Sequence, residues 1–224
     1  MKSLPPIIIL CLLFFISLSG HAQTDSTKVL RKDSLQTKKD TVSALKDSTD
    51  YKDSVRIDKL MQTAERPIIK NSKWSGAIPV SGIDEKPDPK MKYKLLIEIT
   101  WWEKDSAKLR EISSSLAEVG RIINLHAAAG IDKKNIETVI VAHAGVLNAF
   151  LTNEKYQKKF HTDNPNLDII KQLEKNNVKI IACGQAMHFA NIPKEDLLPV
   201  VKVAISAKVA LSTYISKGYV LYTN

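Results

Sequence analysis

The chain is poor in cysteine: 2 Cys occur among its 224 residues, at positions 11 and 183. No Cys-x-x-Cys motif is present, which excludes an oxidoreductase that completes its cycle with its own dithiol. Cys11 lies in an N-terminal segment, residues 1–22, that has the pattern of a cleaved leader, as described below. If that segment is removed, Cys183 is the only thiol left and no internal disulfide can form. A single cysteine in an exported protein is expected to be a reactive thiol, an intermolecular partner or an inert buried side chain.

Long apolar runs are also missing. The longest, residues 7–18, is shorter than the roughly 20 residues that a membrane-spanning helix needs. Lys2 precedes this run, and Gly20 and Ala22 place small residues before a cleavage point at Gln23. We therefore expect residues 1–22 to be a signal peptide and the mature chain to be secreted across the cytoplasmic membrane, into the periplasm, with no membrane span. No small residues precede Cys11 as they would a lipidated cysteine, so it is expected to leave with the leader.

Three kinds of binding site are not supported by the residues present. The formal charge of +9 is spread without a basic block or interleaved aromatics, which argues against nucleic-acid binding. His126, His161 and His188 show no metal-ligand spacing with Cys183 or with one another. Residues 101–103 read Trp-Trp-Glu where a dinucleotide site would need a glycine loop after the first strand. We expect no metal and no cofactor.

Composition divides the remaining chain into three parts. Residues 23–73 are polar and repeat Lys-Asp-Ser/Thr from positions 32, 39, 46 and 52, without the apolar seam of a coiled coil. We interpret them as a charged tether that is disordered or transiently helical, the alternative being a helix that pairs with a partner. Residues 74–90 are rich in Pro and Gly and predict an ordered lead-in anchored by Trp74. The globular domain is expected at residues 91–224.

Within that domain, strand-like and helix-like segments alternate. Apolar periodicity predicts helices at residues 107–129, 146–150, 167–176 and 208–217. Short apolar runs predict strands at residues 93–100, 137–142, 178–182, 201–205 and 219–222. This alternation predicts an α/β fold with a mostly parallel five-stranded sheet covered on both faces.

Polar and aromatic side chains follow the carboxyl ends of the predicted strands, where open parallel sheets bind ligands. They are Trp101, His143, Gly145, Cys183, Gly184, Gln185 and Ser206. Gly184 would allow close approach of a substrate, and amides of the next turn would stabilise a Cys183 thiolate. His143 would act as base or hydrogen-bond donor to the thiol. The alternatives are that Cys183 is a small core side chain and His143 a satisfied polar residue.

Five ordered motifs carry a resemblance to a known family. They are INLHAAAG (123–130), NPNLDIIKQL (164–173), VKIIACGQA (178–186), VAISA (203–207) and KGY (217–219). Residues 91–224 resemble the DsrE/DsrF-like family, specifically its exported single-domain members. The resemblance implies a three-layer α/β/α sandwich, a homo-oligomer such as a trimer or hexamer, and a Cys183 that carries sulfur as a persulfide. Many relatives have His-Gly after the second strand, whereas this chain has His143-Ala144-Gly145.

Two functions from different classes follow. In the first, the protein is a sulfur-handling persulfide carrier or sulfurtransferase that passes sulfur from Cys183 to a thiol-bearing acceptor protein. In the second, it is a non-catalytic oligomeric module that binds a small ligand, with an incidental cysteine. For the first, we expect Trp101 or Trp102 to wall the pocket or a subunit contact; the alternative places both beneath the lead-in of their own chain.

Overall fold

A five-stranded sheet forms the centre of the fold, and all four of its strand pairs are parallel. The computed structural model describes residues 51–70, 72–103 and 105–223. The strands are β1 (Tyr93–Ile99), β2 (Ile136–Ala142), β3 (Lys179–Cys183), β4 (Val201–Ala204) and β5 (Val220–Thr223), in the spatial order β4-β3-β2-β1-β5. All five predicted strands are confirmed, with ends displaced by one residue at most.

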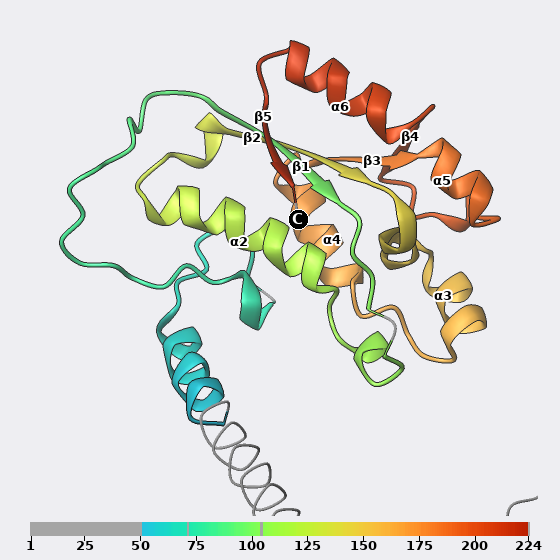
Figure 1. Ribbon diagram of the computed structural model, residues 1–224, viewed down its shortest axis with the longest axis horizontal. Helices are drawn as coiled ribbons and strands as arrows, with labels where there is room; N and C mark the ends of the chain where they lie inside the picture. Colours follow the sequence, from blue (N-terminus) through green and yellow to red (C-terminus); the bar gives the residue numbers. More distant parts are fainter. Residues whose placement is uncertain (1–50, 71, 104, 224) are drawn as a thin grey trace, which may run out of the picture. The chain divides into compact units, whose positions relative to one another are not determined.

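Helices cover both faces of this sheet, so the predicted α/β/α sandwich is confirmed (Figure 1). One face carries α2 (Ser114–Ala128) and α4 (Leu167–Lys175), and the other carries α6 (Ala207–Ser216). Each step from β1 through β4 moves in the same direction across the sheet, whereas the step from β4 to β5 returns to the far edge. Because crossovers between parallel strands are right-handed, the returning connection places α6 on the opposite face.

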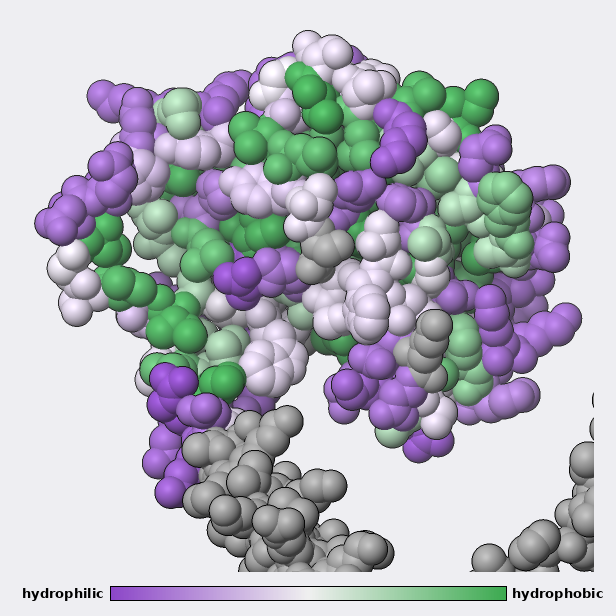
Figure 2. Space-filling view, in the orientation of Figure 1, coloured by the Kyte–Doolittle hydropathy of each residue, from purple (hydrophilic) through white to green (hydrophobic). Residues whose placement is uncertain are grey.

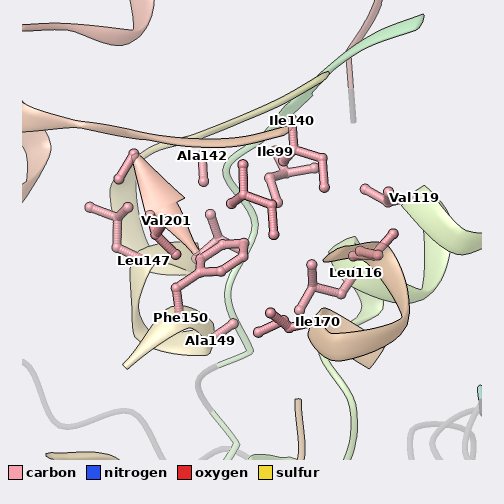
Figure 3. Close-up of a cluster of buried hydrophobic side chains, with 14 of the residues drawn as sticks. Ile99, Leu116, Val119, Ile140, Ala142, Leu147, Ala149, Phe150, Ile170 and Val201 are labelled. Carbon is pink, nitrogen blue, oxygen red and sulfur yellow. The ribbon is translucent and has the colours of Figure 1, made fainter. Parts of the chain in front are cut away.

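The strands are apolar on both sides, as expected of a sheet buried between two helical layers. Ile97 and Ile99 face the core that contains α2 and α4, and Leu96 faces α6. In Figure 3 the ring of Phe150 points into the larger core, between the strand residues and Leu116 and Ile170 of the helices. This packing holds the carboxyl ends of the strands in a defined register.

Two helix predictions need correction, and one short helix was missed. The helix expected at 107–129 begins only at Ser114, after the 3-10 turn η2 (Lys108–Arg110). The Ser113 N–H donates to the side chain of Asn166 at 2.8 Å, a tertiary contact that holds the chain out of the helix there. Residues expected to open a helix at 146–150 form the 3-10 segment η4 (Ala144–Phe150), and α3 (Asn153–Phe160) follows it. The short α5 (Gly184–Phe189) was not predicted.

The N-terminal part of the described chain is more ordered than the sequence suggested. The expected signal peptide, residues 1–22, and the expected tether up to residue 50 lie outside the described residues. Residues 51–63 are helical. Beyond them an N-terminal strap, residues 64–70 and 72–77, packs on the domain, and its Ile69 is fully buried in the larger core. The predicted tether boundary at residue 73 is therefore wrong for this segment. Trp74, the expected anchor of the lead-in, is 50% exposed.

The side chain of Arg66 holds the strap in its folded conformation through hydrogen bonds to backbone carbonyls. Its guanidinium donates hydrogen bonds to the backbone carbonyls of Met61, Ala64, Ser72 and Lys73. A planar guanidinium presents several donors in a fixed geometry, so one side chain can satisfy several carbonyls of a tight loop. Residues 65 and 77 close the loop as an antiparallel bridge.

Candidate functional site

Cys183 lies at the carboxyl edge of the sheet, as the last residue of β3 and the N-cap of α5. Its side chain is 6% exposed and packs with Val141 of β2 and Ala207 of α6. The sulfur accepts a hydrogen bond from the Ala186 N–H at 3.4 Å. The thiol is therefore at the boundary between the smaller core and the surface, next to a backbone donor that can stabilise a negative charge on sulfur.

His143 follows β2 and continues its extended conformation, with φ −150° and ψ 177°. Its backbone N–H donates to the Ile99 carbonyl at 3.1 Å, which extends the pairing with β1 by one residue. Its imidazole Nε2 lies 2.9 Å from the Glu98 carboxylate. The two side chains are 25% and 16% exposed, so the pair is mostly shielded from solvent.

Glu98 is the residue that sequence reasoning missed. It lies inside β1, where its neighbours Ile97 and Ile99 are fully buried in the larger core. Because side chains alternate along a strand, Glu98 faces the α6 side, the same side as Cys183. A carboxylate in an otherwise apolar strand was the available signal, since such a group is costly to bury without a partner.

The structure brings Glu98, His143 and Cys183 onto one face of three adjacent strands, with Glu98 two residues before the position opposite His143. The pairing of β2 with β3 ends at Ala142 and Ala182, so His143 and Cys183 are the next positions along it. Neighbouring strands are about 4.8 Å apart, which places the two residues side by side on the α6 face. The Glu98 carboxylate reaches the imidazole diagonally from β1, and Cys183 lies beside His143 on β3.

The turn after His143 has an unusual backbone. Ala144 adopts φ +58°, a left-handed conformation that costs a non-glycine residue about 1 kcal/mol. Gly145 lies directly against Trp102, because a Cβ added to it would be 2.7 Å from the Trp102 Cβ. The His143-Ala144-Gly145 sequence therefore places the left-handed residue at an alanine and uses the glycine for packing.

The two tryptophans lie in different environments. Trp102 packs against the rings of Tyr156 and Phe160 of α3, with ring centroids 6.4 and 5.9 Å away. The alternative prediction, which placed both tryptophans beneath the lead-in, is therefore wrong for Trp102. Trp101 is 59% exposed, and its carbonyl accepts a hydrogen bond from Ser115.

The remaining predicted site residues flank Cys183. A Cβ on Gly184 would lie 2.9 Å from the Ala204 carbonyl oxygen, so the close approach of β4 requires glycine here. Ser206 caps α6, where its hydroxyl accepts the Val209 N–H at 3.2 Å. Gln185 is exposed on α5. Gly184 and Ser206 thus have structural roles that the sequence prediction did not include.

The surface beside Cys183 is apolar. Figure 2 shows hydrophobic side chains gathered over α6 and the adjoining end of β4. Ile205 and Val209 are 71% and 51% exposed, and Phe189 at the end of α5 is 84% exposed. Apolar residues clustered at a surface are typical of contact sites for other proteins.

Other features of the described residues lie away from this edge. A groove of about 530 Å³ lies at the amino edge of the sheet, beside Thr138, Lys179 and Tyr219. A hydrogen bond with Tyr214 raises the pKa of Lys179, and burial raises the pKa of Tyr219. Among the described residues no cluster of His, Cys, Asp and Glu is arranged to hold a metal, and none of their helices is long and apolar enough to cross a bilayer.

Comparison with known proteins gives one family. The DsrE/DsrF-like family profile matches residues 111–223, which include His143 and Cys183 but not β1. No curated protein matches the chain. A solved structure of a protein of unknown function from Methanobacterium thermoautotrophicum is similar, with a TM-score of 0.43 and 18% identity over 59% of this chain and 100% of that chain. Since the profile covers half of the sequence, the chain belongs to the DsrE/DsrF-like family.

Proposed function

We propose that the protein is a sulfur carrier that holds a sulfane sulfur on Cys183 as a persulfide and transfers it to the thiol of an acceptor protein. Membership of the DsrE/DsrF-like family supports a sulfur-relay-related role. The observation that carries the finer proposal is the position of Cys183, at the carboxyl end of β3 with a backbone N–H on its sulfur. Cys183 is the only cysteine in residues 12–224, so once the leader is removed no thiol of the same chain can displace the bound sulfur.

The chemistry requires two balanced steps. The Cys183 thiolate attacks the outer sulfur of a polysulfide or of thiosulfate, and the donor's S–S bond breaks. The shortened polysulfide or sulfite leaves with the electron pair, and Cys183 becomes a persulfide. The acceptor's thiolate then attacks the outer sulfur, and the Cys183 thiolate is released as the leaving group. Neither step needs a metal or an external oxidant.

The setting of this reaction is also proposed from the chain. The leader-like residues 1–22 support export to the periplasm. The exposed apolar side chains of Phe189, Ile205 and Val209 support a protein contact beside Cys183, either in a homo-oligomer such as a trimer or hexamer, or with the acceptor. In both cases the contact would cover the persulfide and protect it from oxidation.

Intact mass spectrometry tests the carrier function. The mature chain is incubated with a polysulfide or with thiosulfate, desalted and weighed beside Cys183→Ser. One added sulfur raises the mass by about 32 Da, and we expect this adduct in the wild type alone. If the wild type gains no sulfur from either donor, or if the variant gains as much, the proposed carrier role is wrong.

The burial of Cys183 favours a second candidate, the non-catalytic binding module. At 6% exposure the side chain packs like a small hydrophobic residue of the smaller core. Alkylation distinguishes the two: a carrier thiol reacts in the native protein, whereas a core cysteine is protected until the protein is unfolded by denaturant. Complete protection of the native thiol would favour the binding module.

A further inference from the structure

We propose that Glu98 and His143 form a proton relay for Cys183. In this relay His143 accepts the thiol proton, and Glu98 orients the imidazole and stabilises its protonated form. This rests on the proposed sulfur-carrier function and adds the residues that would prepare the nucleophile. The inference comes from the positions of these three side chains on one face of β1, β2 and β3. It also comes from their hydrogen bonds, because neither Nδ1 of His143 nor the proton of the Cys183 thiol has a partner among the described residues.

The first observation concerns the imidazole. Nε2 of His143 is bonded to the Glu98 carboxylate at 2.9 Å. A carboxylate accepts and does not donate, so this contact places the proton of a neutral imidazole on Nε2 and leaves Nδ1 as a lone-pair acceptor. No side-chain or backbone group among the described residues is bonded to Nδ1.

The second observation concerns the thiol. The Cys183 sulfur accepts the Ala186 N–H, but within the described part of the chain its own proton has no acceptor. The side chain is 94% covered, so water has little access to that proton. His143 is the next residue along the pairing of β2 with β3, on the same face of the sheet. The imidazole of this neighbouring residue, whose Nδ1 has no bonded partner among the described residues, is the acceptor that we assign to the proton.

The proposed step follows from these positions. The Cys183 proton moves to Nδ1 of His143, and the imidazolium formed is stabilised by the Glu98 carboxylate on its other nitrogen. The thiolate, steadied by the Ala186 N–H, then attacks the sulfur donor. His143 returns the proton to the departing sulfur group, and Cys183 is left as a persulfide. Hydrogen bonds of this kind are commonly long without substrate and tighten in the complex.

Other charged groups near these three side chains lie on the surrounding elements. Lys202 is on the neighbouring strand β4, two residues before the partner of Cys183, and is exposed. Lys208 at the start of α6 and His188 on α5 are also exposed. Exposed charges are screened by water and salt, so the shielded Glu98 carboxylate is the charge that acts on His143 most strongly.

A structural role for the ion pair is the competing explanation. Under it, Glu98 and His143 satisfy one another in the layer beneath α6 and do not affect Cys183. The structural role predicts loss of stability when either is changed. The relay predicts, in addition, a pH-dependent loss of Cys183 reactivity in variants that remain folded.

The experiment measures the alkylation rate of Cys183 by iodoacetamide from pH 6 to pH 9.5, followed by mass spectrometry on the peptide that contains it. Wild type is compared with His143→Gln, Glu98→Gln and the control Glu137→Gln, a carboxylate on the amino half of the same sheet face. We expect a decrease of about tenfold for His143→Gln and about threefold for Glu98→Gln at pH 6.5. The rates should converge at pH 9.5, where the base is no longer needed, and Glu98→Asp should recover part of the loss. The control should match the wild type.

A second measurement uses the unmutated protein, in case the variants fold poorly. The ¹⁵N resonances of the His143 imidazole are recorded by NMR at pH 8, and they show which ring nitrogen carries the proton. The relay requires the proton on Nε2, facing Glu98, and a lone pair on Nδ1. A neutral imidazole with its proton on Nδ1, or wild-type alkylation rates at pH 6.5 in a folded His143→Gln, would overturn the relay. The sulfur adduct is measured separately by intact mass. If the two variants lose alkylation rate as expected but the wild type gains no sulfur, the carrier function is refuted. If the wild type gains sulfur but the variants alkylate at the wild-type rate, the relay is refuted.

Discussion

Asn124 is predicted to fasten the N-terminal strap to α2, and replacing it with leucine should cost several kcal/mol. Its side chain is fully buried and makes four hydrogen bonds. Oδ1 accepts the N–H groups of Ile68 and Ile69, both at 2.9 Å, and Nδ2 donates to the carbonyls of Ile69 and Ser75 at 2.8 and 2.7 Å. Every polar atom of the amide is thereby paired with the strap backbone.

The magnitude follows from what leucine leaves behind. It has nearly the shape of asparagine, so the core remains filled while the strap loses all four bonds. A hydrogen bond contributes about 1 kcal/mol net, and a buried group left unpaired costs about 1–3 kcal/mol. If the strap detaches instead, it loses the four bonds, at about 1 kcal/mol each, and the burial of Ile69, at about 2 kcal/mol, and this loss is partly offset by the conformational entropy that the freed strap regains. Either route gives a decrease of about 3–5 kcal/mol, or roughly 10 °C in Tm for a domain of this size.

The assay is urea unfolding of the wild type, Asn124→Leu and Asn135→Ala, followed by circular dichroism and by tryptophan fluorescence. Asn135 is the matched control, since its side chain makes one exposed hydrogen bond, to Pro89. Trypsin cleavage beside Lys70 and Lys73 reports detachment of the strap directly. If Asn124→Leu loses less than about 1 kcal/mol, as expected of Asn135→Ala, the amide is not what holds the strap and the reasoning fails.

Four further outcomes are expected. Ala144→Gly should raise stability by about 1 kcal/mol, because glycine adopts the φ of +58° without strain; a lower Tm would contradict this. Gly184→Ala should lower stability by about 1–3 kcal/mol, since the new Cβ would lie 2.9 Å from the backbone of β4, and an unchanged urea midpoint would show that the strand can move aside. Burial raises the pKa of the Tyr156 phenol. Its contribution to stability is therefore present below about pH 10, the pKa of an unfolded tyrosine, and is lost as the pH rises through the higher pKa of the folded state. Tyr156→Phe should lose Tm less steeply above pH 10 than the wild type does, and an equal slope would argue against this. Deleting residues 23–50 should leave Tm nearly unchanged because so polar a segment buries little apolar area, and a drop of several degrees would show that it packs on the domain.

Local patterns were enough to predict the sheet and part of the site. Each strand is a short apolar run bounded by polar residues, so its position could be predicted to within one residue. The residues that end those strands then followed, which is why His143 and Cys183 were both expected at the carboxyl edge. The alternation of strands and helices also predicted helices on both faces of the sheet, and the structure confirms this layering.

Long-range contacts determined the features that the sequence did not reveal. The strap looked like part of a polar tether because its one fully buried apolar side chain, Ile69, is stabilised by an asparagine 55 positions away. The start of α2 was displaced by the bond between Ser113 and the side chain of Asn166. No local pattern contains either contact, because both partners become neighbours only when the chain folds.

The group of acid, imidazole and thiol shows the same division. His143 and Cys183 could be recognised from the ends of their strands, but Glu98 lies within β1, and its partner is set by the parallel register of β1 with β2. The sequence by itself determined which residues the strands contain. Only the order and register of those strands in the sheet, which depend on packing against α2, α4 and α6, decided that these three side chains share one face.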